Sequence, residues 1–255
     1  MARLLPILLL ALFLAPGVNA EPRTVTVGGY EFAPYVEIDE AGKPSGLTVD
    51  LLDAMNAFQK DWRFVLVLTS PNRRYKDFAE GRYDMILFEN PEWGWTGRDL
   101  PFDVTESFVM GGEVFIARAM PGRGQEWFAS LKGRRMVGMR GYHYGFADFQ
   151  TDPDILARDF GMVLVNSNQA SIEMVLKGRA DIAVVTDAYL RRYLAGNPDA
   201  QSRLLISDRL DQVYHHAALL RRSGRPGASD IQALLAAMER EGRLDPLWRA
   251  YGMKR

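Results

Sequence analysis

The sequence of 255 residues contains no cysteine, and its charges are nearly balanced. Without cysteine the chain has no disulfide, no thiolate nucleophile and no cysteine-based metal site, so its core alone must stabilise the fold. It has 31 Lys and Arg against 32 Asp and Glu, which indicates neither a nucleic-acid-binding surface nor a polybasic membrane patch. The absence of low-complexity regions and long linkers argues against a string of small modules.

The first twenty residues have the layout of a cleavable secretory signal. Arg3 precedes an apolar run over residues 4–14, and a small-residue segment ends at Ala20 before Glu21. The run is shorter than the roughly 20 apolar residues that a membrane anchor needs, and no other segment reaches that length. Residues 1–20 are therefore predicted to be a signal peptide cleaved near Ala20, and the mature protein to be periplasmic or secreted.

One unit occurs twice in the sequence, at residues 75–87 and 171–185. Each copy predicts a helix that ends at a glycine, Gly81 or Gly178, because a residue just past a helix end often takes a left-handed conformation that costs glycine nothing. An Arg and an Asp follow, and then a short apolar run that is typical of a parallel strand covered on both faces. Two such units predict two similar α/β lobes, and clefts between domains preferentially bind small ligands.

The rest of the chain continues this α/β pattern. Strands are predicted over residues 24–28, 64–68 and 162–165, and helices over residues 50–58, 230–240 and 244–251. Residues 132–139 begin another α/β unit before the second copy of the repeat.

Eight segments, in this order and spacing, resemble the extracellular solute-binding proteins of family 3. These proteins are the receptors of polar amino-acid ABC importers. The resemblance covers essentially the whole mature chain, although a Gly-Arg-x-Asp step alone is a weak motif. It is carried by Pro34-Tyr35, residues 42–50, Gly81-Arg82-Tyr83-Asp84, Arg98, residues 103–108, residues 131–141, Gly178-Arg179-Ala180-Asp181 and residues 241–252.

The resemblance implies an α/β, two-lobed type II periplasmic binding protein fold, with two hinge crossings and a ligand cleft between the lobes. The crossings would fall near residues 108–112 and 210–214. Lobe one would then comprise residues 21–110 and 212–255, and lobe two residues 111–211. A ligand that touches both lobes would favour a closed state.

The function that the resemblance implies is capture of an amino acid or related small polar solute and its delivery to an inner-membrane ABC permease. Such a protein is a periplasmic monomer that is not an enzyme, needs no cofactor or metal and has no nucleic-acid partner. Alternatives on the same fold are a dehydratase acting on cyclohexadienyl substrates, a module joined to a peptidoglycan-cleaving domain, and a sensor input domain. For the dehydratase, His143 or a cleft carboxylate such as Glu31 would act as acid or base.

The resemblance also implies how an amino-acid ligand would be held. Arg98, by its spacing to Asp103 and Phe108, would bind the α-carboxylate, and a guanidinium offers two parallel donors for that purpose. The alternative is a surface arginine. Asp187, after the strand of the second repeat, would accept the ammonium group, and Thr96 stands close to the place of a threonine in the family.

Two tryptophans precede Arg98 in a segment, residues 88–97, that is longer than in the family. Trp93 or Trp95 is predicted to form a wall of the cleft for apolar or cationic ligand groups, or else to pack its own loop. Tyr30 and Phe32 follow the first strand, and loops at the carboxyl ends of such strands face the crevice.

In lobe two, aromatic residues replace the small hydroxyl residues that the family has in a turn opening a helix. Gly141, Tyr142 and His143 occupy this turn, where backbone N–H groups would suit a carboxylate. His143 would contact the ligand or be a simple loop histidine. Large flat side chains on both lobes predict a ligand with an apolar or planar part, rather than a simple polar amino acid such as glutamine.

Overall fold

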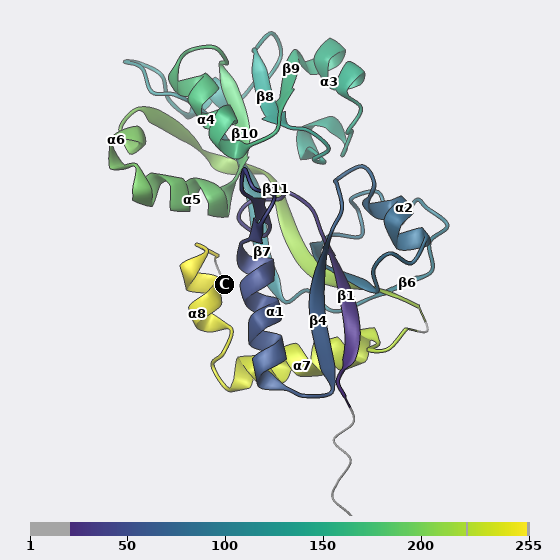
Figure 1. The fold of residues 1–255 in the computed structure, drawn as a ribbon. Helices are drawn as coiled ribbons and strands as arrows, with labels where there is room; N and C mark the ends of the chain where they lie inside the picture. Colours follow the sequence, from purple (N-terminus) through teal and green to yellow (C-terminus); the bar gives the residue numbers. More distant parts are fainter. Residues whose placement is uncertain (1–20, 223, 254–255) are drawn as a thin grey trace, which may run out of the picture.

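The computed structural model describes residues 21–222 and 224–253, so the predicted signal peptide, residues 1–20, lies outside the described residues. Two α/β lobes are joined by two long strands, β7 (Val109–Arg118) and β11 (Leu204–Arg221) (Figure 1). No helix in residues 21–222 and 224–253 is long and apolar enough to cross a membrane.

Lobe one combines the N-terminal part of the described chain with its C-terminal helices. Its strands β1, β4 and β5 are parallel, as predicted for an α/β lobe. Its elements are β1 (Arg23–Gly29), β2 (Glu37–Ile38), β3 (Pro44–Ser45), α1 (Leu47–Phe58), β4 (Trp62–Leu68), α2 (Arg74–Ala79), β5 (Met85–Glu89), β6 (Phe102–Val104), α7 (Ala228–Arg240) and α8 (Asp245–Ala250).

Lobe two lies between the two long strands in the sequence, and β8, β9 and β10 are its parallel strands. Side-chain caps begin two of its helices: Asp152 accepts hydrogen bonds from two N–H groups of α3, and Ser167 accepts one from α4. Its elements are η1 (Gln125–Phe128), β8 (Met136–Met139), η2 (Gly145–Ala147), α3 (Pro153–Phe160), β9 (Met162–Val165), α4 (Asn168–Leu176), β10 (Ile182–Thr186), α5 (Asp187–Gly196) and α6 (Pro198–Gln201).

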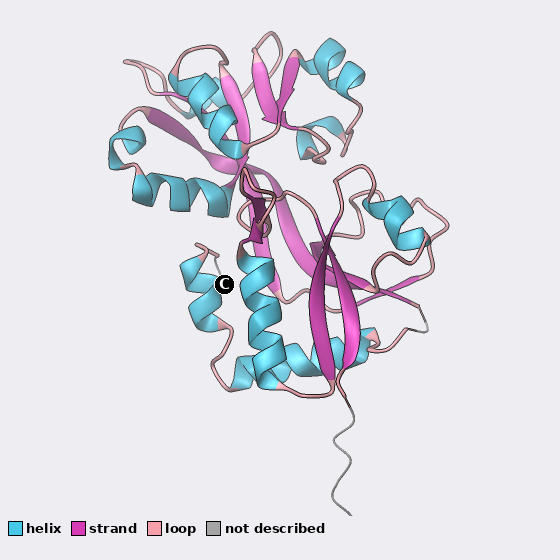
Figure 2. Ribbon diagram, viewed as in Figure 1, coloured by secondary structure: helices cyan, strands magenta, loops and turns pink. Residues whose placement is uncertain are grey.

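The two lobes share one hydrogen-bonded strand order, β4-β1-β5-β11-β7-β10-β8-β9, with β6 paired to β11. The two predicted α/β lobes are present, and β7 and β11 pair with each other antiparallel through the crossing and so connect the sheets of both lobes (Figure 2). Register shifts between Ile206 and Leu210 and between Leu210 and Gln212 interrupt this ladder. The predicted lobe boundaries, after residues 110 and 211, fall inside these strands, so the exact division stays a prediction.

The two copies of the repeat use their aspartates in the same way. Asp84 accepts hydrogen bonds from the backbone N (2.8 Å) and the Oγ1 (2.7 Å) of Thr26, on the neighbouring strand β1. Asp181 accepts hydrogen bonds from the backbone N and side chain of Arg135, directly before β8. Each carboxylate therefore fixes the start of its strand beside a parallel neighbour.

Asp84→Ala should lower the free energy of unfolding by about 1–3 kcal/mol, because it leaves the Thr26 N–H without its acceptor in a partly buried position. Urea unfolding, followed by circular dichroism, measures this change. The control is Asp53→Ala on the exposed face of α1, which should shift the midpoint little. Equal midpoints for the two variants would show that Asp84 does not hold β1 and β5 together.

Candidate functional site

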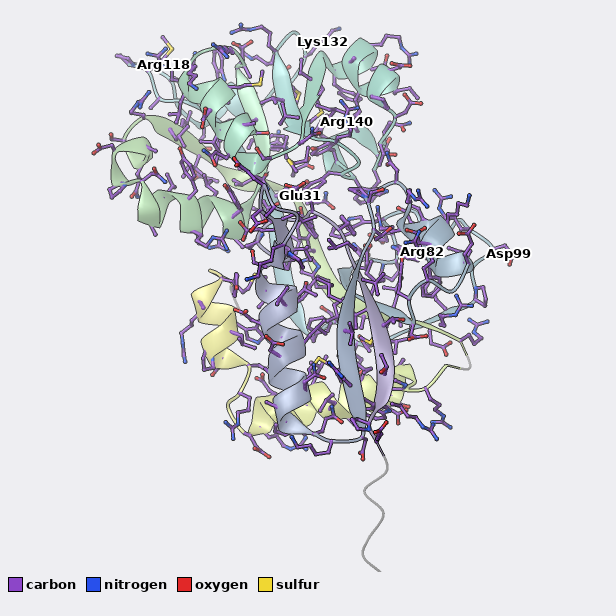
Figure 3. All side chains as sticks on the ribbon, in the orientation of Figure 1. Glu31, Arg82, Asp99, Arg118, Lys132 and Arg140 are labelled. Atoms are coloured by element: carbon purple, nitrogen blue, oxygen red, sulfur yellow. The ribbon has the colours of Figure 1, made fainter. Side chains whose placement is uncertain are left out.

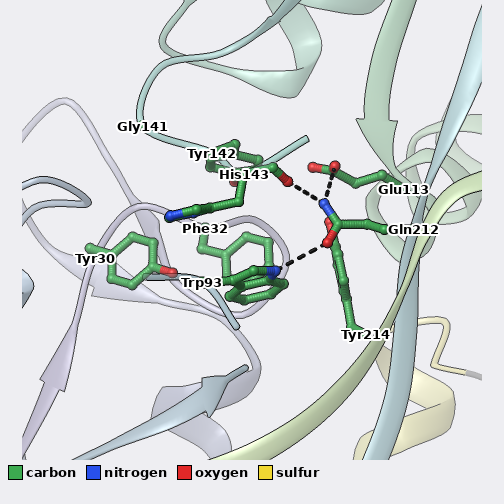
Figure 4. Close-up of a pocket in the computed structure, with 9 residues that line it drawn as sticks. All are labelled: Tyr30, Phe32, Trp93, Glu113, Gly141, Tyr142, His143, Gln212 and Tyr214. Carbon is green, nitrogen blue, oxygen red and sulfur yellow. Dashed lines mark hydrogen bonds between the residues drawn. The ribbon is translucent and has the colours of Figure 1, made fainter. Parts of the chain in front are cut away.

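A small cavity lies where the two lobes meet the crossing strands (Figure 4). Loops after β1, β5 and β8 reach it from the carboxyl ends of these parallel strands, the edge at which α/β sheets form ligand crevices. Its volume of about 10 Å³ is close to the space that one water needs. The lining residues are Tyr30, Phe32, Trp93, Glu113, Gly141, Tyr142, His143, Gln212 and Tyr214.

Gln212 connects both lobes at the cavity through one side-chain amide. Its Oε1 accepts a hydrogen bond from Trp93 Nε1 of lobe one (3.1 Å), and its Nε2 donates to the His143 carbonyl of lobe two (Figure 4). Nε2 also lies 3.0 Å from Glu113 Oε2 on β7, to which it donates. A crossing strand thus supplies a polar contact to both lobes at the cleft.

Aromatic rings cluster around Phe32 where the two lobes meet. The Phe32 ring lies edge-to-face against Tyr142 of lobe two at 5.2 Å and against Trp93 at 5.7 Å between ring centroids. Trp93 in turn contacts Tyr214 on β11 at 4.8 Å. These edge-to-face geometries are favourable for aromatic pairs, so the rings around the cavity are packed in the manner of a core.

The loop that carries Phe32 is fixed against helix α1 and β11. Gly46, with φ of 109°, precedes α1, and a Cβ there would lie 2.8 Å from the carbonyl oxygens of Pro34 and Tyr35. The Tyr35 hydroxyl lies 2.7 Å from Nε2 of the buried His216 on β11. The sequence thereby orients Phe32 toward the cavity through a tight turn and a contact to the crossing strand.

Glu113 is the buried acidic group of the cavity, with 1% of its surface exposed. Burial, with a smaller contribution from Asp211, raises the pKa of Glu113 to about 8, although hydrogen bonds from Gln212 and Tyr214 act in the opposite direction. At neutral pH this carboxyl is therefore mostly protonated in the closed cleft. Asp211 itself accepts hydrogen bonds from the backbone N of Gly145 and Phe146, which fixes the loop of lobe two to β11.

His143 and Tyr142 present neutral rings to the cavity. Burial, helped by the positive charges of Arg74 and Arg98, lowers the pKa of His143 to about 3. Its ring lies parallel to that of Trp93, at 6.4 Å between centroids. The Tyr142 hydroxyl is buried and has no hydrogen-bond partner within residues 21–222 and 224–253.

A fully buried ion pair lies behind the cavity in lobe one. Arg74 Nε is 3.1 Å from Glu89 Oε1, and both side chains are at most 1% exposed. Glu89 Oε2 also accepts a hydrogen bond from Trp95 Nε1 at 2.8 Å, and the Arg74 guanidinium lies 4.9 Å from the centre of the Tyr30 ring. The two charges neutralise each other beneath the cavity wall.

The segment around Arg98 is divided between the cavity and the lobe interior. Trp93 lines the cavity, whereas Trp95 is buried in lobe one and Thr96 is exposed outside it. The exposed Arg98 donates from Nε to the Gly94 carbonyl, and its guanidinium lies 4.0 Å from the centre of the Tyr75 ring. Neither Arg98 nor Thr96 lines the cavity, so the predicted carboxylate role of Arg98 stays a prediction.

Asp187 lies at the start of helix α5 and is not among the residues that line the cavity. It forms an ion pair with Arg191, one turn further along the helix, and Arg191 Nε donates to the Gly252 carbonyl of lobe one. Arg192 pairs with Glu37 of lobe one. Helix α5 is therefore an inter-lobe contact, and the predicted ammonium role of Asp187 also stays a prediction.

Six of the ten predicted site residues line the cavity together: Tyr30, Phe32, Trp93, Gly141, Tyr142 and His143. Sequence reasoning missed Glu113, Gln212 and Tyr214, which the crossing strands supply. Their position at the two predicted crossings was the available signal, because a crossing strand must pass the cleft.

A second hollow of about 290 Å³ lies between Ser70-Pro71-Asn72 of lobe one and Met139-Arg140 of lobe two. Glu31 also lines it, and Figure 3 shows Glu31 at the level where the lobes meet, whereas Arg118 and Lys132 lie at the far end of lobe two. Burial and the nearby Glu37 raise the pKa of Glu31. This hollow borders the aromatic cavity, since its lining residues Glu31 and Arg140 are the chain neighbours of Tyr30 and Gly141.

No protein-family model matches the sequence, and no curated protein matches it either. The structure, however, is similar to many solved ones. It matches an ancestral arginine-binding protein bound to arginine with a TM-score of 0.66 and 18% identity, over 89% of this chain and 97% of that chain. It also matches a histidine kinase sensor domain with similarity to periplasmic binding proteins, with a TM-score of 0.66 and 20% identity, over 91% of this chain and 98% of that one.

A third similar structure is an ancestral amino acid-binding protein described as a precursor of cyclohexadienyl dehydratase. Its TM-score is 0.65 at 16% identity, over 89% of this chain and 94% of that one. At these identities the similarity establishes the fold. The chain has the two-lobed type II periplasmic binding protein fold that the family resemblance implied, and its structural neighbours are mostly binding proteins.

Glu89→Ala should lower the free energy of unfolding by about 3–5 kcal/mol, because it leaves the Arg74 charge buried without a partner. Chemical denaturation of the variant measures the loss. Glu92→Ala, three residues later and exposed, is the matched control and should stay within about 0.5 kcal/mol of the wild type. A wild-type midpoint for Glu89→Ala would mean that water reaches Arg74.

Proposed function

We propose that this chain is a periplasmic solute-binding protein that captures a small ligand between its lobes and delivers it to an inner-membrane ABC permease. The observation that carries the proposal is a cavity lined by side chains of both lobes and of both crossing strands. A ligand there contacts both lobes and both crossing strands. Binding and lobe closure are thereby coupled.

Ligand entry requires the lobes to separate, because the closed cavity of about 10 Å³ has no room for an amino acid or amine. Separation breaks the ring contacts between Phe32 and Tyr142 and the hydrogen bonds of Gln212 to Trp93 and His143. A ligand that replaces these contacts on both lobes favours the closed state by its differential affinity for that state. The lining residues of the two lobes provide the surfaces that such a ligand would contact.

The lining residues favour a ligand with a planar or apolar part. Tyr30, Phe32, Trp93, Tyr142 and Tyr214 supply rings, and the polar groups among them are few. Such a site is a poor match for a simple polar amino acid, whose groups would lose water without gaining enough hydrogen bonds. Capture as a monomer, without cofactor or metal, completes the proposal.

A dehydratase on this fold is the second candidate, and Glu113 is the observation that favours it. A carboxyl with a pKa of about 8 in an aromatic pocket suits a general acid, which needs to hold its proton at neutral pH. Incubation with a cyclohexadienyl substrate, followed by chromatography, tests this candidate. Formation of an aromatic product that Glu113→Gln abolishes would establish the enzyme and overturn a purely binding role.

A thermal-shift screen of residues 21–255 against amino acids, amines and organic acids tests the binding role. A ligand at 100 times its dissociation constant should stabilise the folded state by about 2.7 kcal/mol. No stabilisation by any compound would contradict the proposal.

Trp93→Ala should weaken binding of the ligand found in that screen by at least about tenfold, since it removes a ring of the cavity wall and the Nε1 donor to Gln212. Calorimetry of the folded variants measures the change. Trp62→Ala, on the edge strand β4, should bind as the wild type does. Arg98→Ala belongs in the same series, because a comparable loss there would assign the ligand carboxylate to Arg98 instead.

A further inference from the structure

Glu113 is a buried carboxyl that faces the cavity without a basic partner. Its described partners are the Gln212 amide at 3.0 Å and the Tyr214 hydroxyl, and its charged neighbour Asp211 has the same sign. No ion pair of Glu113 is found within residues 21–222 and 224–253. A buried carboxylate is costly unless a positive charge accompanies it. An ionised Glu113 would therefore need a positive partner from outside the described chain.

The walls around Glu113 suit a positive charge. Phe32, Trp93, Tyr142 and Tyr214 present aromatic rings to the same cavity, and the face of an aromatic ring attracts a cation. The Tyr142 hydroxyl is buried with no hydrogen-bond partner in the described chain, which leaves an acceptor for an N–H group. Both features lie within one small volume and are independent of Glu113.

The same cavity is unsuitable for a carboxylate. Arg74, the buried arginine of lobe one, is already neutralised by Glu89, and Arg98 lies on the Tyr75 ring outside the lining. His143 lines the cavity, but its lowered pKa keeps it neutral. A ligand anion would therefore meet Glu113 with no positive side chain to offset it.

We propose that the cavity binds a small organic cation, an amine or quaternary ammonium on an apolar or planar body, with Glu113 as its counter-ion. This inference rests on the proposed binding function and names the class of ligand. The ligand cation replaces the contact that the Gln212 amide makes to Glu113 in the closed cleft. Any polar end of the ligand lies in the hollow at Glu31 and Arg140.

The proposal requires that binding release a proton. Glu113 is mostly protonated below pH 8 in the ligand-free cleft, and a cation favours its ionised form, so affinity for a permanently charged ligand falls as pH falls. The tyrosine hydroxyls facing Glu113 do not ionise in this range because burial raises their pKa. The titratable groups that face Glu113 are Asp211, Tyr214, Tyr142, Tyr144 and Tyr35.

Calorimetry of residues 21–255 with matched probes tests the proposal. Choline is compared with its neutral isostere 3,3-dimethylbutan-1-ol, and phenethylamine with phenylacetate. Each cation should bind at least tenfold more tightly than its uncharged or anionic counterpart. The two cations also distinguish a site for a quaternary ammonium from a site for a primary amine.

Glu113→Gln is the decisive variant, because the amide has the shape of the protonated carboxyl and should fold. It should lose at least tenfold in affinity for the better cation and gain nothing for the neutral probe. Glu40→Gln, in an exposed turn, is the matched control and should bind as the wild type does. For choline, affinity should rise by up to about tenfold per pH unit from pH 6 to 8 in the wild type and stay flat in Glu113→Gln.

Other results of these titrations would overturn the inference. They also distinguish failure of the cation proposal from failure of the proposed solute-binding function. Equal binding of cation and isostere, or full binding by Glu113→Gln, would show that the cavity does not use Glu113 as a counter-ion. Glutamine, which has no net charge, is a further probe in this series. Binding of glutamine, but of neither cation, would leave the solute-binding role in place and reject the cation. Absence of binding in every arm would reject both.

Discussion

The antiparallel pairing of β7 with β11 is the constraint on which the rest of the structure depends. These two strands connect the sheets of both lobes, and their ladder is interrupted between Ile206 and Gln212, directly beside the cavity. The residues of the crossing strands therefore have two roles. Glu113, Gln212 and Tyr214 belong to the hinge by their backbone and to the binding surface by their side chains. A ligand that contacts them acts on the part of the molecule whose geometry sets the angle between the lobes.

The distribution of charge follows from the same arrangement. Lobe one neutralises its deep charges internally, through Arg74 and Glu89, and helix α5 forms ion pairs at the outer inter-lobe contact. Glu113 has no such partner in the described chain, since Asp211 beside it is also acidic. Most other residues of the cavity are aromatic. An ionised Glu113 would attract a positively charged ligand, whereas a protonated Glu113 could donate a proton. In this cavity, a counter-ion role and a proton-donor role would therefore differ in the protonation state of Glu113.

The sequence predicted the elements that depend on local pattern. The structure confirms the strands predicted at residues 24–28, 64–68 and 162–165 and the helices predicted at residues 50–58 and 230–240. These elements could be predicted because the spacing of apolar residues depends only on neighbouring positions in the sequence. The continuous pairing of β7 with β11 was not predicted, because it joins segments about a hundred residues apart. Arg98 is not among the residues that line the cavity, because spacing along the chain does not fix where a side chain points. Its guanidinium lies on the Tyr75 ring and its Nε donates to the Gly94 carbonyl.

The aromatic residues of the cleft were easier to predict than its polar ones, and the reason is physical. Tyr30 was predicted from its place after the first strand, because loops at the carboxyl ends of such strands face the crevice. Trp93 was proposed from its position beside Arg98, and Tyr142 from the turn that the family resemblance implies. Glu113 lies within an apolar strand, where alternation gives two possible faces and the sequence does not say which one borders a cavity. A buried carboxyl inside such a strand is costly, and a structure retains it where a ligand or a proton compensates. Glu113, a carboxyl within an otherwise apolar strand, is therefore the residue that says most about the ligand of the site.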